Sequence, residues 1–211
     1  MALAGLIAPI WFTLLVIVQG FQDGYSHVAM PISALTAWPA GWVQRFNFCV
    51  TGILMVVFAV GLHRRVAPSR FGAVGFALLA LGGIGIVFAG IFPWVLVNGV
   101  PSETPAHVAA AITSFGSTSL GLMVFSRRLA TDDRWSDLAP YTLFTGATMA
   151  VLFVALGRFA IDDGTPLHPW AGLLQRVICA IWFTCVLVLA SRFRRLEQGD
   201  RVRADPATPS V

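Results

Sequence analysis

Four ionisable side chains interrupt or border long apolar runs of this sequence: Arg45, His107, Arg158 and Arg176. A charge in such a run is costly to bury and usually serves a function. A histidine there can act as a general acid or base, and an arginine can hold an anionic group or lower the pKa of a nearby carboxylate. We therefore look for function where these residues gather.

His107 is at the head of a narrow polar stripe. At about 100° per residue on a helix, Ser114 and Thr118 return to nearly the same direction as His107. Lipid does not stabilise such a stripe, so we expect it to face the interior. His107 is then a candidate acid/base or ligand group. The alternative is that His107 only caps its helix while the hydroxyls bond carbonyls one turn back.

Arg176 follows another polar residue, Gln175, and lies roughly 9 Å by helical rise inside the boundary at Trp170. We expect an interior carboxylate partner for it. The acids available on that side are Asp23, Glu103, Asp162 and Asp163. Of these, Asp23 and Glu103 join His107 as candidate catalytic groups. Arg176 and Gln175 are candidate substrate-binding residues, together with Ser33, Arg45, Asn47, Trp94 and Ser114.

The composition identifies the elements that position these residues. The chain is 57% hydrophobic and 11% charged, whereas soluble domains are about 25% charged. A helix crosses a bilayer with roughly 20 apolar residues. We predict an all-α polytopic membrane protein, a six-helix bundle formed by residues 1–197 with a disordered cytoplasmic tail at 198–211. The predicted spans are 4–21, 43–62, 71–92, 107–126, 139–159 and 170–191.

Arginine counts in the short connections predict that both termini are cytoplasmic. The run 127–137 is then a solvated inner loop, and the segment 22–41 is amphipathic enough to fold onto the outer rim. All basic residues are Arg, which favours a GC-rich bacterial genome and hence a multi-pass protein of the bacterial inner membrane. The pI near 9.6 reflects topology and contact with anionic membrane lipids, so we expect no nucleic-acid partner.

No spacing in the sequence is typical of a metal or cofactor site, and we expect neither. His27, His107 and His168 with the outer acids are an alternative zinc ligand set, but no H-E-x-x-H pattern supports it. The three cysteines fall within the spans without C-x-x-C spacing. Most of the seven Trp and sixteen Phe should form the aromatic belt and ordinary packing, with an aromatic-lined pocket as the alternative.

A series of short motifs resembles the DUF998 family of six-span membrane proteins: Pro31-Ile32-Ser33, Asn47 and Gly52, Phe92-Pro93 followed by His107, and Gln175-Arg176 with Trp182. The family has no assigned function. The resemblance implies the six-span fold and singles out Ser33, Asn47, His107 and Arg176. Members often carry an Asp shortly after the Pro that matches Pro93, whereas Trp94 and Val95 follow here, so chemistry relying on that acid would need Glu103 instead.

These observations predict a polar pocket in the outer half, walled by the second, fourth and sixth spans and roofed by the first and third outer loops. The leading hypothesis is an enzyme acting on a lipophilic small molecule, a lipid or isoprenoid, that enters from the bilayer. Acid-initiated cyclisation is one concrete version. The alternatives are a small transporter or proton-coupled carrier, and a non-catalytic assembly or sensor subunit.

Overall fold

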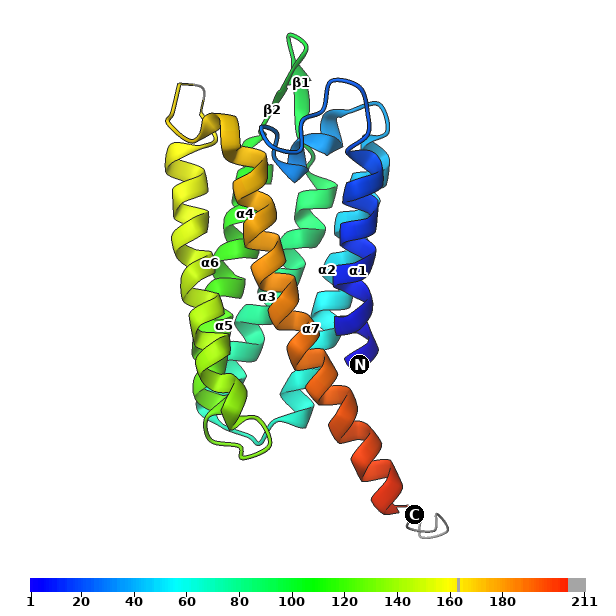
Figure 1. Cartoon of the computed structure of the whole chain (residues 1–211), viewed down its shortest axis with the longest axis vertical. Coiled ribbons are helices and arrows are strands. Elements are labelled where there is room, and N and C mark those ends of the chain that lie inside the picture. The colour runs from blue at the N-terminus through cyan, green and yellow to red at the C-terminus, as the bar shows by residue number, and fades with distance from the viewer. Residues whose placement is uncertain (163, 205–211) are drawn as a thin grey trace.

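The computed structural model describes residues 1–162 and 164–204, which form a bundle of long helices (Figure 1). Within this part, six helices are long and apolar enough to cross a membrane, which confirms the predicted fold class. Five spans are built on α1 (Ala2–Gln19), α2 (Gly41–Arg65), α3 (Arg70–Ile91), α6 (Ala139–Phe159) and α7 (Ala171–Ala204). The fourth span joins α4 (Pro105–Ala111), the π-helical turn η2 (Ile112–Gly116) and α5 (Ser117–Leu129).

The spans form a ring in chain order. Each packs against its neighbours in sequence, and α7 closes the ring against α1. The N-terminus and the last described residues of α7 lie at the same end of the bundle (Figure 1). We call this the inner end; the opposite, outer end carries the connections 20–40, 92–104 and 160–170.

Small residues let neighbouring helices approach closely. A Cβ atom added at Gly52 of α2 would lie only 2.5 Å from the carbonyl oxygen of Gly83 in α3. On its other side, α3 meets the fourth span, where a Cβ at Gly85 would lie 2.5 Å from the amide nitrogen of Ser114. Backbones in such contact gain packing energy that lipid cannot match. The bundle is therefore tight between α2, α3 and the fourth span.

The first outer connection folds into the bundle. Its 3-10 helix η1 (Ile32–Ala37) is buried over five of its six residues. The segment before it is held on α7, because the Leu173 amide donates to the carbonyl of Val28 over 2.9 Å. A Cβ at Gly172 would lie 2.3 Å from the carbonyl oxygen of Met30, so glycine is needed for this close approach. The prediction that this segment covers the outer rim is confirmed. Its helix η1 also extends below the rim into the interior of the bundle.

The second outer connection is a short hairpin, β1 (Val95–Val97) paired antiparallel with β2 (Val100–Ser102). Its two turn residues, Asn98 and Gly99, both have positive φ, 52° and 80°. This backbone matches the tight turns that favour Asn-Gly. The remaining short elements are η3 (Ser136–Leu138) and η4 (His168–Trp170).

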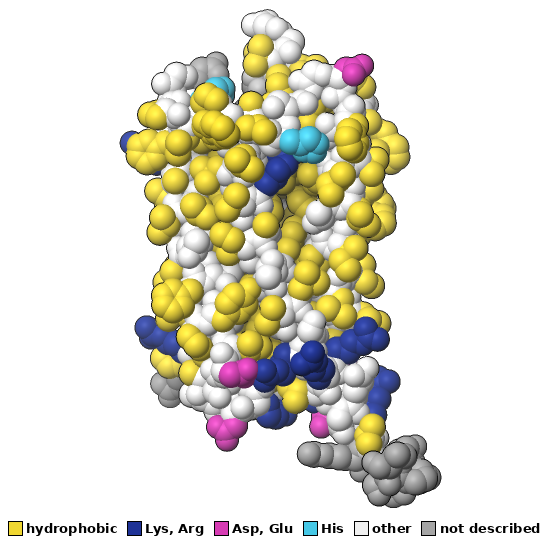
Figure 2. All heavy atoms as spheres, viewed as in Figure 1, with side chains coloured by type: hydrophobic (Ala, Val, Ile, Leu, Met, Phe, Trp, Pro, Cys, Tyr) yellow, Lys and Arg dark blue, Asp and Glu magenta, His cyan; other side chains and the backbone are white. Residues whose placement is uncertain are grey.

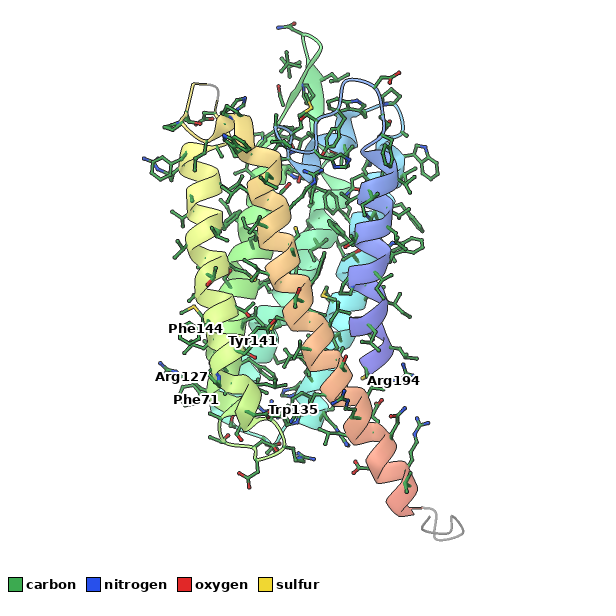
Figure 3. All side chains as sticks on the ribbon, in the orientation of Figure 1. Phe71, Arg127, Trp135, Tyr141, Phe144 and Arg194 are labelled. Atoms are coloured by element: carbon green, nitrogen blue, oxygen red, sulfur yellow. The ribbon has the colours of Figure 1, made fainter. Side chains whose placement is uncertain are left out.

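The inner end departs from the sequence analysis at Arg128. This side chain is only 1% exposed, so the prediction that 127–137 is a solvated loop is wrong there. Its guanidinium donates to the carbonyl oxygens that end α2, those of His63, Val66 and Ala67. A cation at a helix C-terminus satisfies carbonyls that have no partner within the helix. Arg127, by contrast, is exposed and lies over the Phe71 ring at 5.6 Å (Figure 3).

The C-terminal helix is longer than predicted. Residues 198–204 continue α7, so the predicted disorder from residue 198 is wrong for these residues. An ion pair between Asp200 and Arg65, 2.5 Å long, links this extension to the end of α2. Residues 205–211 of the predicted tail lie outside the described residues.

Candidate functional site

A small polar cavity lies in the outer half of the bundle. Its volume is about 40 Å³, enough for one or a few water molecules. Polar side chains on its wall are Ser33, Thr51, His107, Ser114 and Gln175. Aromatic wall residues are Phe12, Phe48, Phe115, Trp182 and Phe183. The predicted walls from the second, fourth and sixth spans are present, α1 and α3 also contribute, and only the first outer connection forms the roof.

His107 is fixed at the outer end of this cavity and is 1% exposed. Its Nδ1 atom lies 2.7 Å from the carbonyl oxygen of Phe92. A carbonyl only accepts hydrogen bonds, so Nδ1 carries a proton, and in the neutral ring Nε2 holds the lone pair. The N-cap of α4 is Thr104, whose hydroxyl accepts from the His107 amide at 3.2 Å. The alternative that the His107 side chain is itself the cap is therefore wrong.

The polar stripe below His107 faces inward, as predicted. Ser114 is 4% exposed and Thr118 is 1% exposed. Ser114 lies within η2, and a π-helical turn inside a longer helix is frequent at functional sites. Thr118 lines a second, deeper cavity of about 30 Å³ whose other wall residues are apolar. Trp182 borders both cavities.

Asn47 belongs to a buried amide network beside the cavity. Its Nδ2 donates to the carbonyl oxygen of Phe12 at 3.2 Å and to Oε1 of Gln44 at 3.3 Å. The same Gln44 oxygen accepts from Gln19 of α1 at 3.0 Å, and Thr51 donates to Asn47. These contacts join α1 to α2. Asn47 therefore positions the cavity wall, and Thr51 is the member of the network that reaches the cavity.

Gln175 connects the roof to α7. Its Oε1 accepts from the backbone amide of Ile32 at 2.5 Å. Ser33, the next residue, lines the cavity, and its carbonyl oxygen accepts from Thr36 at 2.7 Å. Gln175 and Ser33, both predicted ligand residues, thus meet at the same wall.

A larger groove opens on the side of the bundle between α1 and α7, with a volume of about 530 Å³. We call it the lateral groove. Its lower walls are mainly apolar side chains, among them Ile10, Leu14, Ile17 and Leu187, with Thr13 and Thr184 as polar members. Its outer end is formed by His27 and Arg176. In Figure 2, a Lys or Arg side chain (dark blue) and a histidine side chain (cyan) lie side by side in the upper part of this face, among hydrophobic side chains.

Arg176 is held entirely by neutral acceptors. Its Nη1 donates to the carbonyls of Met30 and Gly172 at 3.2 and 3.0 Å, and its Nη2 donates to the Tyr25 hydroxyl at 2.7 Å and to Nδ1 of His27 at 2.9 Å. Among the described residues no carboxylate lies within ion-pair distance. The predicted carboxylate partner is therefore wrong within this part, because the outer loop folds carbonyls and a phenol onto the guanidinium.

His27 is neutral in this arrangement. Burial, followed by the charge of Arg176, lowers the pKa of His27 below its ordinary value. The neutral ring accepts from Arg176 at Nδ1, so its Nε2 carries the proton. A Cβ at Gly20 would lie 2.0 Å from that Nε2, so the ring sits in space that only glycine leaves free.

Glu103 is not in the polar cavity with His107. It lines a separate outer vestibule of about 430 Å³, with Trp94, Asp162 and His168. Burial, followed by the nearby charge of Asp162, raises the pKa of Glu103. Trp94 connects the two sites, since its ring contacts the His107 ring edge-on at 6.3 Å. Glu103 therefore belongs to the outer vestibule and not to the polar cavity.

Two further predicted site residues lie away from the cavity. Asp23 is exposed on the first outer connection. Arg45 is also exposed, and its Nε donates to the carbonyl oxygen of Gly90 at 3.1 Å, which links α2 to α3. Asp163 lies outside the described residues. The described residues contain no group of three His, Cys, Asp or Glu side chains arranged to hold a metal ion.

The lateral groove and the polar cavity are neighbours. They share four wall residues, Phe12, Ile32, Cys179 and Phe183. One layer of side chains therefore separates the lateral groove from the cavity that His107 lines.

The fold and this pair of sites define a multi-pass membrane protein built as a six-helix bundle, with an outer-half cavity beside a lateral groove. A family model described as "Protein of unknown function (DUF998)" matches residues 6–192, so the chain belongs to the DUF998 family. The resemblance found in the sequence is thus confirmed. No curated protein and no solved structure matches the chain.

Proposed function

We propose that this protein is a membrane enzyme acting on a lipophilic molecule that it takes from the bilayer through the lateral groove. The supporting observation is the shared wall of Phe12, Ile32, Cys179 and Phe183. A molecule in the groove would lie one side-chain layer from the cavity that His107 lines. Its apolar part would pack on α1 and α7, and its reacting part would meet the polar cavity. We place the protein in the cell membrane of a bacterium, because the chain contains only Arg as its basic residue.

His107 is the candidate acid/base group. The Phe92 carbonyl fixes its tautomer and orientation and leaves Nε2 to accept a proton. Ser33, Ser114 and Gln175 supply polar contacts on the same wall. A lipid or isoprenoid substrate fits the aromatic lining, and acid-initiated cyclisation remains a concrete version. No described lining residue of the cavity is a carboxylate, and Nε2 of neutral His107 carries a lone pair, so His107 would first have to take up a proton at Nε2 before it could donate one to a substrate.

Substrate access requires a side chain to move. A volume of about 40 Å³ cannot contain a lipid chain. Phe12 and Phe183 stand between groove and cavity and contact each other at 5.1 Å between ring centroids. Rotation of either ring would join the two spaces. We propose that substrate binding in the groove drives this rotation.

A transporter is supported less well. Below the polar cavity, the deeper cavity is lined by Met55, Phe58, Leu122 and other apolar side chains, with Thr118 as its polar wall residue. Such a layer offers neither a polar path nor a proton relay toward the inner end. If no turnover is found, the protein is better explained as a non-catalytic assembly or sensor subunit.

The test uses purified protein incubated with lipids extracted from its own host membrane, followed by mass spectrometry of the lipids. We expect a new lipid species with the wild type and none with His107→Gln, which keeps a hydrogen-bonding side chain of similar reach. Thr113→Val is the matched control, because Thr113 lies on the same span outside the cavity lining. Identical lipid profiles for wild type and His107→Gln would contradict the enzyme proposal.

A further inference from the structure

Arg176 carries a positive charge that nothing in the described part of the chain neutralises. Its four hydrogen-bond acceptors are two carbonyls, a phenol and an imidazole. These groups hold the guanidinium in place without cancelling its charge. A cation that is partly withdrawn from water and lacks a counter-ion attracts an anion strongly, because the local dielectric constant is low.

The position of this charge indicates what kind of anion would bind. Arg176 and His27 form the outer end of the lateral groove, while the wall below them is mainly apolar and belongs to two of the membrane-spanning helices, α1 and α7. A ligand that satisfies both parts has an anionic head and a hydrocarbon chain. Membrane phospholipids combine these two features, and an arginine beside a phosphate is a common pairing because the guanidinium keeps its positive charge.

We infer that the lateral groove binds one membrane lipid with a net-anionic phosphate headgroup, its phosphate at Arg176 and His27 and its acyl chain between α1 and α7. This inference rests on the proposed function, of which it names the substrate class. The proton on Nε2 of His27 makes this ring a second donor for a phosphate oxygen. The Nη atoms of Arg176 stay engaged with the loop, so the guanidinium is preorganised before the lipid arrives.

The experiment compares phosphatidylglycerol with phosphatidylcholine of identical acyl chains, added to the purified full-length protein in detergent. Retained lipid is counted by native mass spectrometry, and affinity is measured from thermal stabilisation. We expect one phosphatidylglycerol per chain, bound at least about tenfold more tightly than phosphatidylcholine, because the choline ammonium cancels the phosphate charge of phosphatidylcholine and is repelled by Arg176. Inorganic phosphate at equal concentration should not compete, because it cannot fill the apolar groove.

Arg176→Gln should abolish the preference for the anionic lipid. Arg45→Gln is the matched control. It also removes one arginine charge at the outer end of the bundle, but Arg45 lines neither the groove nor the cavity. If Arg176→Gln does not fold, Arg176→Lys keeps the charge and should keep the preference at lower stability. Gly20→Ala should displace the His27 ring and weaken phosphatidylglycerol binding severalfold without altering charge.

Three results would overturn the inference: equal binding of the two lipids by the wild type, an unchanged preference in Arg176→Gln, or a dimer whose formation excludes lipid from the groove. The two proposals fail separately. If the two lipids bind equally but turnover depends on His107, the enzyme proposal stands and the proposal of an anionic substrate class fails. If the protein prefers the anionic headgroup but shows no turnover, the lipid-site proposal stands and the enzyme proposal fails.

Discussion

The guanidinium of Arg176 donates a 2.7 Å hydrogen bond to the hydroxyl of Tyr25, a residue 151 positions earlier in the chain. The Tyr25 hydroxyl has one proton, which it shares between the carbonyls of Met30 and Pro31, 3.1 Å away in each case. One arginine therefore ties the first outer connection to α7. The same arginine supplies the positive charge at the head of the lateral groove, so its structural and binding roles must be separated by experiment.

Tyr25→Phe separates these roles, because it removes the hydroxyl and leaves the charge. Loss of a partly buried hydrogen bond to a charged group should lower the free energy of unfolding by about 1–3 kcal/mol. Thermal denaturation in detergent measures the loss. The preference for phosphatidylglycerol should persist. If Tyr25→Phe instead removed the preference as completely as Arg176→Gln, the loop geometry would be responsible for it and not the charge.

Adjacent arginines at the inner end should behave very differently. Arg128→Met leaves the carbonyls that end α2 without their buried donor and should destabilise the bundle by on the order of 3 kcal/mol. Arg127→Met removes an exposed side chain over Phe71 and should cost under about 1 kcal/mol. The melting temperatures of the two variants in one detergent provide the comparison. Equal losses would show that Arg128 is solvated.

Asp132 should make the inner connection sensitive to acid. Its hydrogen bond from Arg134 is the main cause that lowers the pKa of Asp132 from 3.8 to about 2. A depressed folded-state pKa stabilises the protein above the unfolded value, and this contribution is lost as the pH falls through the folded value. The wild type should therefore melt above Asp132→Asn at neutral pH, and the difference should vanish toward about pH 2. A difference in melting temperature that does not change with pH would contradict a role of the Asp132–Arg134 ion pair. Asp133→Asn is the control, because Asp133 is exposed.

Accessibility labelling tests which side of the membrane each end faces. In a background without native cysteine, Ser102→Cys should react with an impermeant reagent added outside intact cells, because it lies in the hairpin at the outer end. Thr131→Cys, exposed at the inner end, should react only after the membrane is opened. The reverse pattern would place Arg176 and His27, at the end of the lateral groove, in the cytoplasmic leaflet.

The six spans and the inward polar stripe were predictable because the bilayer demands long apolar runs and does not tolerate exposed polar stripes. The hairpin was missed, although Asn98-Gly99 is a strong turn signal. The burial of Arg128 also left a signal, since Gly121, Phe125 and Arg128 follow one another at intervals of about one turn and share a buried face.

The partners of Arg176 left no such signal. Tyr25, His27 and Met30 reach it through a loop whose path depends on tertiary packing at Gly172. The separation of Glu103 from His107 is equally hidden. It depends on Trp94, which lines the vestibule, contacts the His107 ring and donates its amide to Thr36 of η1. Sequence spacing describes helix faces well and describes contacts across long loops poorly.

The central claim is that a lipophilic molecule occupies the lateral groove, and photolabelling tests it most directly. A phospholipid with a photoreactive group on its acyl chain is crosslinked in membranes, and labelled peptides are mapped by mass spectrometry. We expect labels concentrated on the groove faces of α1 and α7, abolished by Ala180→Trp within the groove and retained in Ala109→Trp on the exposed face of α4. Labels spread evenly over all lipid-facing helices, and unchanged by Ala180→Trp, would contradict the account.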